Sequence, residues 1–208
     1  SCPSLRVLLE AARAIATGAD KTLEVKVTPF DGIFAAMDAG TCDAVVSSVS
    51  ITDERKQNMD FSEPYFDAEQ SVMVTKANAE KYKTLADLTG QEIGVQSGTT
   101  GEEYVNSHKP SGSTVKALPG ASDLFAALQS GTIAAVVQDY PINAYRTTQD
   151  KNFVITEKIP TEEQYGMAVK KGNTETLDLL NKGLSTAKSD GTYDKLYEKY
   201  FGEKPPTS

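Results

Sequence analysis

Residues 34–46 read FAAMDAGTCDAVV, and residues 125–137 repeat the pattern as FAALQSGTIAAVV. In both segments an apolar helical stretch ends at a glycine, Gly40 or Gly131, and an apolar strand follows. These strands carry almost no polar side chains, as expected of parallel strands that are buried on both faces. The repeat therefore predicts two lobes with the same α/β architecture.

The alternation of helix and strand continues on both sides of the repeats. Around the first repeat we expect strands at residues 5–7, 23–27 and 43–47, and helices at residues 8–16 and 31–39. Around the second we expect a helical turn at residues 85–88, strands at 92–96, 114–117 and 134–138, and helices at 100–107 and 122–129. Two amphipathic helices, residues 174–187 and 191–200, are expected to pack back on a sheet.

Two β-rich runs, residues 71–75 and 166–169, have the length of strands that cross between the lobes. The predicted lobes are residues 1–73 plus 169–208 and residues 74–168. The expected fold class is α/β and two-lobed, with a mostly parallel sheet flanked by helices in each lobe and two hinge strands between them.

The composition narrows the possible partners. The 29 acidic and 21 basic side chains give a net charge of −8, which argues against binding to nucleic acid. No run of 18 apolar residues is present, so no membrane-spanning helix is expected. The first residues lack the apolar stretch of a signal peptide, and we expect a chain from which that peptide has been removed.

Cys2 and Cys42 are the only cysteines, and His108 is the only histidine. Their spacing does not fit a metal site, and no cofactor is expected. The two cysteines are candidates for one disulfide of an exported protein, although Cys2 could also be a lipid-attachment site. His108 lies in a polar stretch and is expected to be a solvated loop residue.

Two polar segments follow apolar strands about forty residues apart. Residues 47–55 read SSVSITDER and residues 96–102 read QSGTTGE. Hydroxyl groups and open backbone amides bind anions, and the guanidinium of Arg55 matches a carboxylate bidentately. Either segment alone is typical of an ordinary turn. Together they predict a site for a carboxylate.

Several motifs in sequence order carry a resemblance that covers residues 8–202. They are Phe30-Asp31-Gly32, Ser50-Ile51-Thr52-x-x-Arg55, Asp60-Phe61-Ser62-x-Pro64-Tyr65, Leu85-x-x-Leu88-x-Gly90, Gly94-Val95-x-x-Gly98-Thr99-Thr100, Asp139-x-Pro141 and Asp190-Gly191-Thr192-Tyr193. With them the chain resembles the family 3 extracellular solute-binding proteins of polar amino-acid ABC transporters. The resemblance implies the type II periplasmic-binding-protein fold, whose lobes close over a ligand.

The resemblance also implies roles for single residues. Arg55 would hold the α-carboxylate of the ligand, helped by Ser50 and Thr100, and Asp139 would hold the α-ammonium. Phe30 would pack on the ligand's side chain, and Ser48 would lie next to the ammonium. The other positions of the implied ligand-binding set are Val49, Ser97 and Thr99. The alternative is that Arg55 and Asp139 are ordinary surface residues, as most charged residues are, and that Phe30 belongs to the core.

The function implied is capture of a polar or basic L-amino acid and its delivery to a membrane permease, without catalysis. The protein is expected to be a monomer in the periplasm or outside the cell. One alternative is an amino-acid sensor. Another is a prephenate-type dehydratase, for which Glu102, Glu103 or Glu163 would have to serve as the general acid.

One departure from the family concerns Val7 and Leu8. In the family, a segment of some 25 residues that forms one wall of the pocket separates the first strand from the first helix. A strand-to-helix reversal needs a loop of at least two residues, so we expect the chain to be interrupted between Val7 and Leu8. A true deletion would instead remove that wall.

Overall fold

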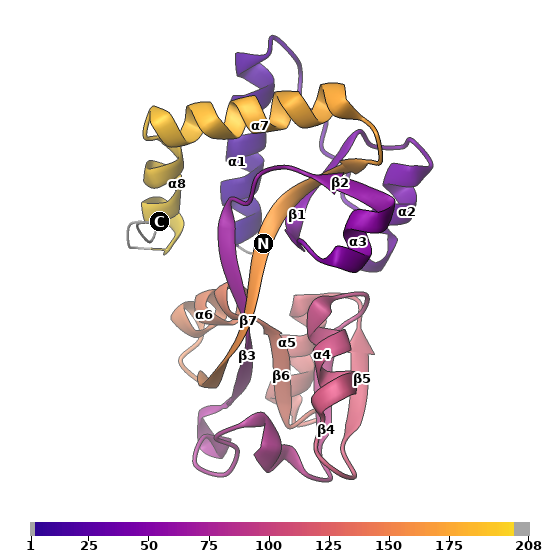
Figure 1. The fold of residues 1–208 in the computed structure, drawn as a ribbon. Coiled ribbons are helices and arrows are strands. Elements are labelled where there is room, and N and C mark those ends of the chain that lie inside the picture. The colour runs from indigo at the N-terminus through magenta and orange to yellow at the C-terminus, as the bar shows by residue number, and fades with distance from the viewer. Residues whose placement is uncertain (1–2, 202–208) are drawn as a thin grey trace. The chain divides into compact units, whose positions relative to one another are not determined.

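The computed structural model describes residues 3–201 and divides the chain into two compact units. Unit 1 contains residues up to Thr28, Gly32–Asp67 and the chain from Glu163 onward, and unit 2 contains Pro29–Asp31 and Ala68–Glu162. Both units combine helices with strands, which confirms the mixed α/β fold with helices flanking a central sheet (Figure 1).

The sheet of unit 1 is built on the second half of the long strand β7 (Phe153–Lys170). Strands β1 (Ala44–Ser50) and β2 (Met59–Phe61) both pair with β7 in the antiparallel sense. The parallel sheet predicted for the first lobe is therefore wrong in these pairings. The reason is that residues 5–7 and 23–27, the expected parallel neighbours of β1, do not form strands.

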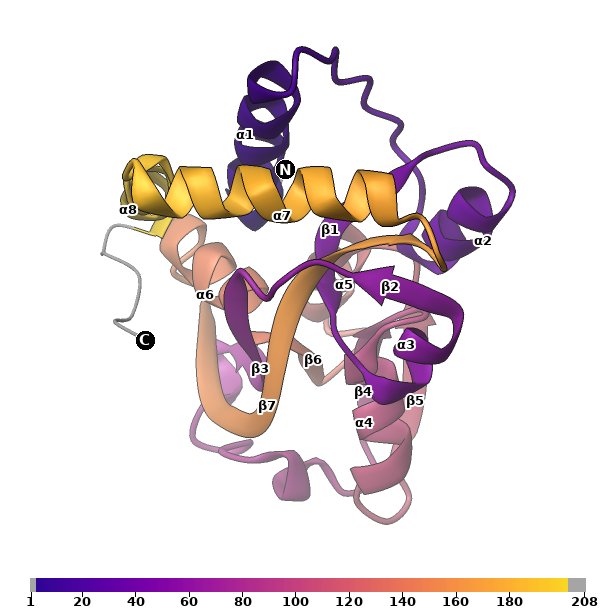
Figure 2. The same cartoon turned by 45° about the horizontal axis from the view of Figure 1, so that its top comes forward.

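The helices of unit 1 come from both ends of the chain. Helix α1 (Pro3–Gly18) packs against α7 (Thr174–Ser189), α8 (Thr192–Phe201) and β1, as Figures 1 and 2 show. The remaining helices of this unit are the short α2 (Ile33–Asp38) and α3 (Asp53–Asn58). The predicted C-terminal helices are thus confirmed, but α7 and α8 pack largely on α1.

Gly183 allows α1 and α7 to approach closely. A Cβ atom at this position would lie 2.8 Å from Cβ of Ile15, which is buried in α1. Real carbon atoms do not approach so closely without displacement. The close packing of α1 and α7 therefore requires a residue without a side chain at position 183.

We expect Gly183→Ala to lower the free energy of unfolding by about 1–2 kcal/mol. Overpacking costs about 1–3 kcal/mol, and the better helix propensity of alanine returns up to about 1 kcal/mol. Thermal unfolding followed by circular dichroism measures the effect. Ser185→Ala, at an exposed position of the same helix, is the control and should leave the melting temperature equal or higher. Equal gains in both variants would contradict the packing argument.

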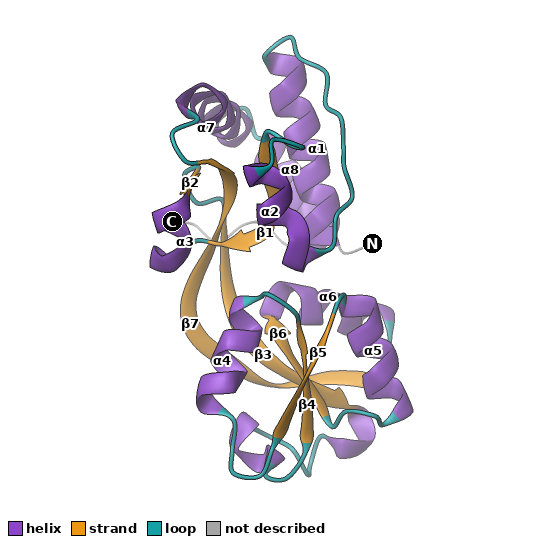
Figure 3. Cartoon of the chain, turned by 90° about the vertical axis from the view of Figure 1, so that its right-hand side faces the viewer, coloured by secondary structure: helices purple, strands orange, loops and turns teal. Residues whose placement is uncertain are grey.

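Unit 2 has the strand order β7-β3-β6-β4-β5. Strand β4 (Glu92–Gln96) is parallel to β5 (Thr114–Leu118) and β6 (Ala135–Asp139), whereas β3 (Phe66–Thr75) is antiparallel to β6. Helices α4 (Thr100–His108) and α5 (Ala121–Ser130) lie on opposite faces of this sheet (Figure 3), and α6 (Tyr140–Gln149) follows β6 directly. Short 3-10 helices at Lys76–Asn78 and Leu85–Leu88 complete the unit.

The core of unit 2 has one apolar cluster on each face of the sheet. Val72 and Val74 of β3 point into one cluster, and Met73 between them points into the other. This is the two-residue period of a strand that is buried on both faces. In the second repeat, Ala135 and Val137 belong to the first cluster and Val136 to the other, so the same double burial explains the apolar composition of its strand.

Most predicted elements are confirmed, including β4 with the predicted bounds. The predictions of two strands, at residues 5–7 and 23–27, and of a chain break after Val7 are wrong. Residues 5–7 belong to α1, which runs without interruption through Val7 and Leu8, so neither a strand-to-helix junction nor a break is found there. Residues 23–27 form no strand, and α3, β2 and α6 were not expected.

The two units divide the chain earlier than the predicted lobes 1–73 plus 169–208 and 74–168. The division falls after Asp67 in β3 and after Glu162 in β7. The β-rich runs taken as crossing segments lie on either side of it, because residues 71–73 pair with β6 and residues 166–169 pair with β1 and β2. Gln164 donates to Asp67 at 2.8 Å beside the division.

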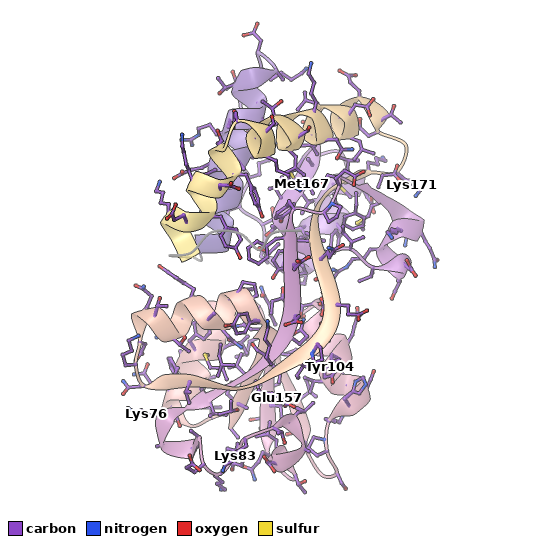
Figure 4. All side chains as sticks on the ribbon, turned by 60° about the vertical axis from the view of Figure 1, so that its left-hand side comes forward. Lys76, Lys83, Tyr104, Glu157, Met167 and Lys171 are labelled. Carbon is purple, nitrogen blue, oxygen red and sulfur yellow. The ribbon has the colours of Figure 1, made fainter. Side chains whose placement is uncertain are left out.

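Two of the sequence motifs stabilise the fold of unit 1. Asp60 accepts from Lys171, labelled in Figure 4, at 2.7 Å and from the amide of Gly172 at 2.8 Å, and both contacts lower the pKa of Asp60. The hydroxyl of Tyr193 donates to the carbonyl of Tyr65, and burial raises the pKa of Tyr193. These motifs hold the ends of β7 and α8 in place.

Candidate functional site

The first group of predicted site residues lies at the end of β1 in unit 1. Ser48 has a left-handed backbone (φ 53°) inside an irregularity of the β1–β7 register between Val45 and Val49. Val49 is fully buried, so its side chain belongs to the core. The bulge turns the strand, and Ser50 is buried with its hydroxyl donating to Oε2 of Glu163 at 2.6 Å.

Arg55 is positioned by the helix that follows β1. The hydroxyl of Thr52 caps α3 by accepting from the amide of Arg55 at 3.1 Å. The guanidinium of Arg55 donates to the carbonyl of Ser50 at 2.9 Å and lies 5.2 Å from the ring centroid of Phe34. The structure therefore joins Ser50 and Arg55 directly, a contact that the sequence analysis did not predict.

The second group lies in unit 2, in the turn between β4 and α4. Gly98 has a left-handed backbone (φ 76°), and its amide donates to Oε2 of Glu102 at 2.8 Å. Thr99 caps α4 by accepting from the amide of Glu102, while its own hydroxyl donates to Gln96. The amide of Ser97 donates to Leu118. Thr100 is the first residue of α4, at the positive end of the helix dipole, which favours an anion.

Asp139 lies at the end of β6, where α6 begins, and only 8% of it is exposed. Gln70, fully buried, sits opposite it in the register of β3 and β6. The side-chain amide of Gln70 donates to Oδ1 of Asp139 at 2.7 Å and to the hydroxyl of Thr100 at 3.4 Å. Gln70 thus connects the predicted ammonium-binding carboxylate with the predicted anion-binding helix end.

The sequence analysis missed Gln70. Its signal was a polar residue at the start of the apolar run of β3, next to Ser71. Polar side chains that are fully buried must be hydrogen-bonded, and their partners are often functional. Gly101 provides the space for this side chain, since a Cβ there would lie 2.9 Å from Oε1 of Gln70.

A second buried polar chain supports the same strand end. Gln138 donates to Asn143 of α6 at 2.7 Å, and Asn143 donates to the hydroxyl of Ser71 at 2.9 Å. The hydroxyl of Ser71 in turn donates to the carbonyl of Gln138. This closed set of hydrogen bonds fixes α6, which follows Asp139 in the chain, to β3 and β6.

Phe30 opens the 3-10 helix Phe30–Gly32 and is half-buried. The structure groups Pro29–Asp31 with unit 2, where Cα of Asp31 lies 3.3 Å from the position of a Cβ on Gly98. A side chain at position 98 would therefore be strained by the φ value and crowded by this contact.

Two of the three acids considered for catalysis, Glu102 and Glu163, have structural partners. Glu102 accepts from Gly98, and Glu163 accepts from Ser50. His108 ends α4 and stacks on Tyr104, labelled in Figure 4, with ring centroids 4.1 Å apart, so it is not the loop residue that was expected. Within residues 3–201 no cluster of three or more His, Cys, Asp or Glu side chains has the geometry to hold a metal ion.

The predicted disulfide involves Cys2, which lies outside the described residues, so the pairing and the lipid-attachment alternative stay predictions. Cys42 lies between α2 and β1 and is half-buried. Burial and the neighbouring Asp43 raise the pKa of its thiol. Among the described helices, none is both long and apolar enough to cross a membrane.

Comparison with known proteins finds relatives over nearly the whole chain. Residues 8–203 match the family model of the bacterial extracellular solute-binding proteins, family 3. The ABC transporter glutamine-binding protein GlnH of Bacillus subtilis is 36% identical over 80% of this chain and 60% of its own length. The ABC transporter arginine-binding protein 1 of Escherichia coli is 34% identical over 83% of this chain and 71% of its own length. The chain thus spans less than two thirds of the first of these relatives.

Solved structures give the same result. An ancestral arginine-binding protein, known bound to arginine and bound to glutamine, is 40% identical with a TM-score of 0.87, over 94–95% of this chain and 88% of its own. An ancestral amino-acid-binding protein, described as a precursor of cyclohexadienyl dehydratase, is 36% identical with the same TM-score, over 94% of this chain and 85% of its own.

Proposed function

Because the chain belongs to the bacterial extracellular solute-binding proteins of family 3, we propose that it binds an L-amino acid. Arg55 of unit 1 takes the α-carboxylate, and Asp139 of unit 2 takes the α-ammonium. Ser50 and Thr100 assist at the carboxylate, while Ser48, Ser97, Thr99 and Phe30 line the ligand. Val49, whose side chain is in the core, contributes only its backbone. The amino acid is handed to the permease of an ABC transporter.

The observation that carries the proposal is the hydrogen-bonded set Gln70, Asp139 and Thr100. A buried carboxylate held rigidly at a strand end suits an ammonium group, and the neighbouring helix end suits a carboxylate. An amino acid carries both charges on one carbon atom. The bond from Arg55 to Ser50 holds the guanidinium of unit 1 in place for the same carboxylate.

Ligand binding supplies the energy for closure of the units. A ligand shifts such an equilibrium only by the difference in its affinity for the two states. If the carboxylate meets Arg55 and the ammonium meets Asp139, the closed state gains both contacts at once. Hinge closure of this type needs only local changes in the crossing strands β3 and β7.

We further propose that the protein works outside the cytoplasm and is no enzyme. The relatives are named as binding proteins, and the candidate acids Glu102 and Glu163 are already engaged in structural hydrogen bonds. The likeness to a dehydratase precursor keeps one enzymatic test worthwhile. Incubation with prephenate should give no product; turnover would contradict the proposal.

Calorimetric titration with each of the twenty L-amino acids tests the proposed function. Arginine and glutamine come first, because the ancestral relative has been solved with both. We expect one polar or basic amino acid to bind at about micromolar Kd, near −8 kcal/mol. If none of the twenty binds to folded protein, the proposal is wrong.

A test of Gln70 follows from its position. We expect Gln70→Leu to weaken amino-acid binding about 10- to 100-fold, because hydrogen bonds to a charged group contribute about 1.5–3 kcal/mol. The loss should be confined to ligands with an α-ammonium group, since the substitution releases Asp139. Titration with the best amino acid and with its desamino analogue measures this difference.

Gln138→Leu is the matched control. It also removes a buried amide, but one that bonds Asn143 rather than Asp139. It should lower stability comparably while changing affinity less. An equal loss of affinity in both variants would show that Gln70 is only a packing residue.

A further inference from the structure

The segment between α1 and α2 has the sequence of a β-strand, but in the structure it pairs with no other described strand. Residues 23–27 read Leu-Glu-Val-Lys-Val, an alternation typical of a half-buried strand. In the structure they lie in the long loop between these helices, seen in teal in Figure 3 and between α1 and α2 in Figure 2. The sequence pattern and the observed state therefore disagree.

The backbone of this segment is available for pairing. Within residues 3–201, the amide and carbonyl groups of residues 23–27 make no backbone hydrogen bond, and none of these residues has a positive φ. Val25 is 48% exposed and Val27 95% exposed. An exposed apolar row with unpaired backbone groups is a template for an added strand.

The sequence of the segment is complementary to itself. In an antiparallel pair centred on Val25, Glu24 of each copy faces Lys26 of the other, and Leu23 faces Val27. A pair centred on Glu24 or on Lys26 would set like charges opposite each other, which is destabilising. A shift by one residue would place apolar against charged side chains. One register is thus favoured over its neighbours.

We propose that residues 23–27 pair antiparallel with the same residues of a second copy of this chain. The two strands bury far less than the ~1,200 Å² of a stable interface, so the dimer is weak and reversible. The net charge of −8 on each copy opposes association further. The chain is then a monomer in dilute solution, as its sequence predicts, and a dimer when concentrated.

Sedimentation equilibrium of four forms of the full chain tests the proposal. Glu24→Lys and Lys26→Glu each place like charges opposite each other and should weaken self-association about tenfold. The double variant, Glu24→Lys with Lys26→Glu, should restore it. An equal mixture of the two single variants should form a mixed dimer more tightly than either variant pairs with itself.

The double variant also controls for the local fold. Lys26 donates to the carbonyl of Thr41 at 2.8 Å, and both the single and the double exchange at position 26 remove this bond. Recovery in the double variant therefore cannot come from that contact. Equal association of all four forms would mean that another surface pairs, and would overturn the proposal.

Hydrogen exchange of the unsubstituted chain gives a test that needs no variant. Amides of residues 23–27 should exchange more slowly in concentrated than in dilute protein, while α1 and α2 stay unchanged. Equal exchange rates at all protein concentrations up to about 1 mM would also overturn the proposal, because a dimer with a Kd of about 1 mM has an association free energy of about −4 kcal/mol. Neither test uses an amino-acid ligand, so its outcome is independent of the proposed binding function.

Discussion

Replacing Arg55 with alanine is expected to lower amino-acid affinity by about three orders of magnitude. Removal of one partner of a desolvated ion pair costs about 3–5 kcal/mol, and each 1.4 kcal/mol is a tenfold change. Most of the loss comes from leaving the ligand's carboxylate without its counter-ion. Calorimetric titration with the best ligand measures it.

Arg55→Lys separates charge from geometry. Lysine keeps the positive charge but cannot donate to a carboxylate bidentately. It also lacks the guanidinium group that lies over the ring of Phe34. We expect an intermediate loss of about 10- to 100-fold. An alanine variant that binds as well as the unsubstituted chain would show that Arg55 serves only to hold Ser50 in place.

Asp139→Asn is expected to weaken binding about 100-fold or more. The substitution removes the charge opposite the α-ammonium but keeps the shape, and Gln70 can still donate to the remaining side-chain oxygen. The fold is therefore expected to survive. The cost reflects a buried cation that has lost its partner.

The ligand offers the matched control for Asp139. The desamino analogue of the best amino acid should bind weakly to the unsubstituted chain and no more weakly to the Asp139→Asn variant. The two changes together should then cost less than the sum of the two alone. Strict additivity would show that Asp139 and the ammonium group do not meet.

The sequence predicted the elements of unit 2 well because its signals are local there. Gly131 ends α5 in the left-handed conformation, and Thr99 caps α4. These positions need particular residues for steric and hydrogen-bonding reasons. Periodicity and caps act over a few residues, so one sequence shows them directly.

The errors in unit 1 have the opposite cause. Residues 5–7 and 23–27 have strand composition, yet α1 takes up the first and the second lacks a pairing partner within the described chain. Strand formation depends on neighbours that lie far away in the sequence, and helix formation does not. Local patterns therefore do not reveal which strands are paired.

In the candidate site, a charged residue could be proposed from the sequence, but the neutral residue Gln70, which supports the site, could not. Arg55 was proposed from the polar segment in which it lies, whereas Asp139 was proposed only through the resemblance to the family. Gln70 can be recognised as part of the site only from the strand register, which places it opposite Asp139. Such a pairing between β3 and β6 joins residues 69 positions apart, and no local pattern encodes it.

Unit 1 is made of segments from both ends of the chain, which are synthesised before and after most of unit 2. Among the residues that the structure describes, its strands β1 and β2 pair with β7, and Ala68–Glu162 must be synthesised before that part of β7 appears. At roughly 5–20 residues per second this interval lasts about 5–20 s. Unit 2 is complete only when this interval ends, and until then the apolar strand β1 stays without its partner and is open to chaperones.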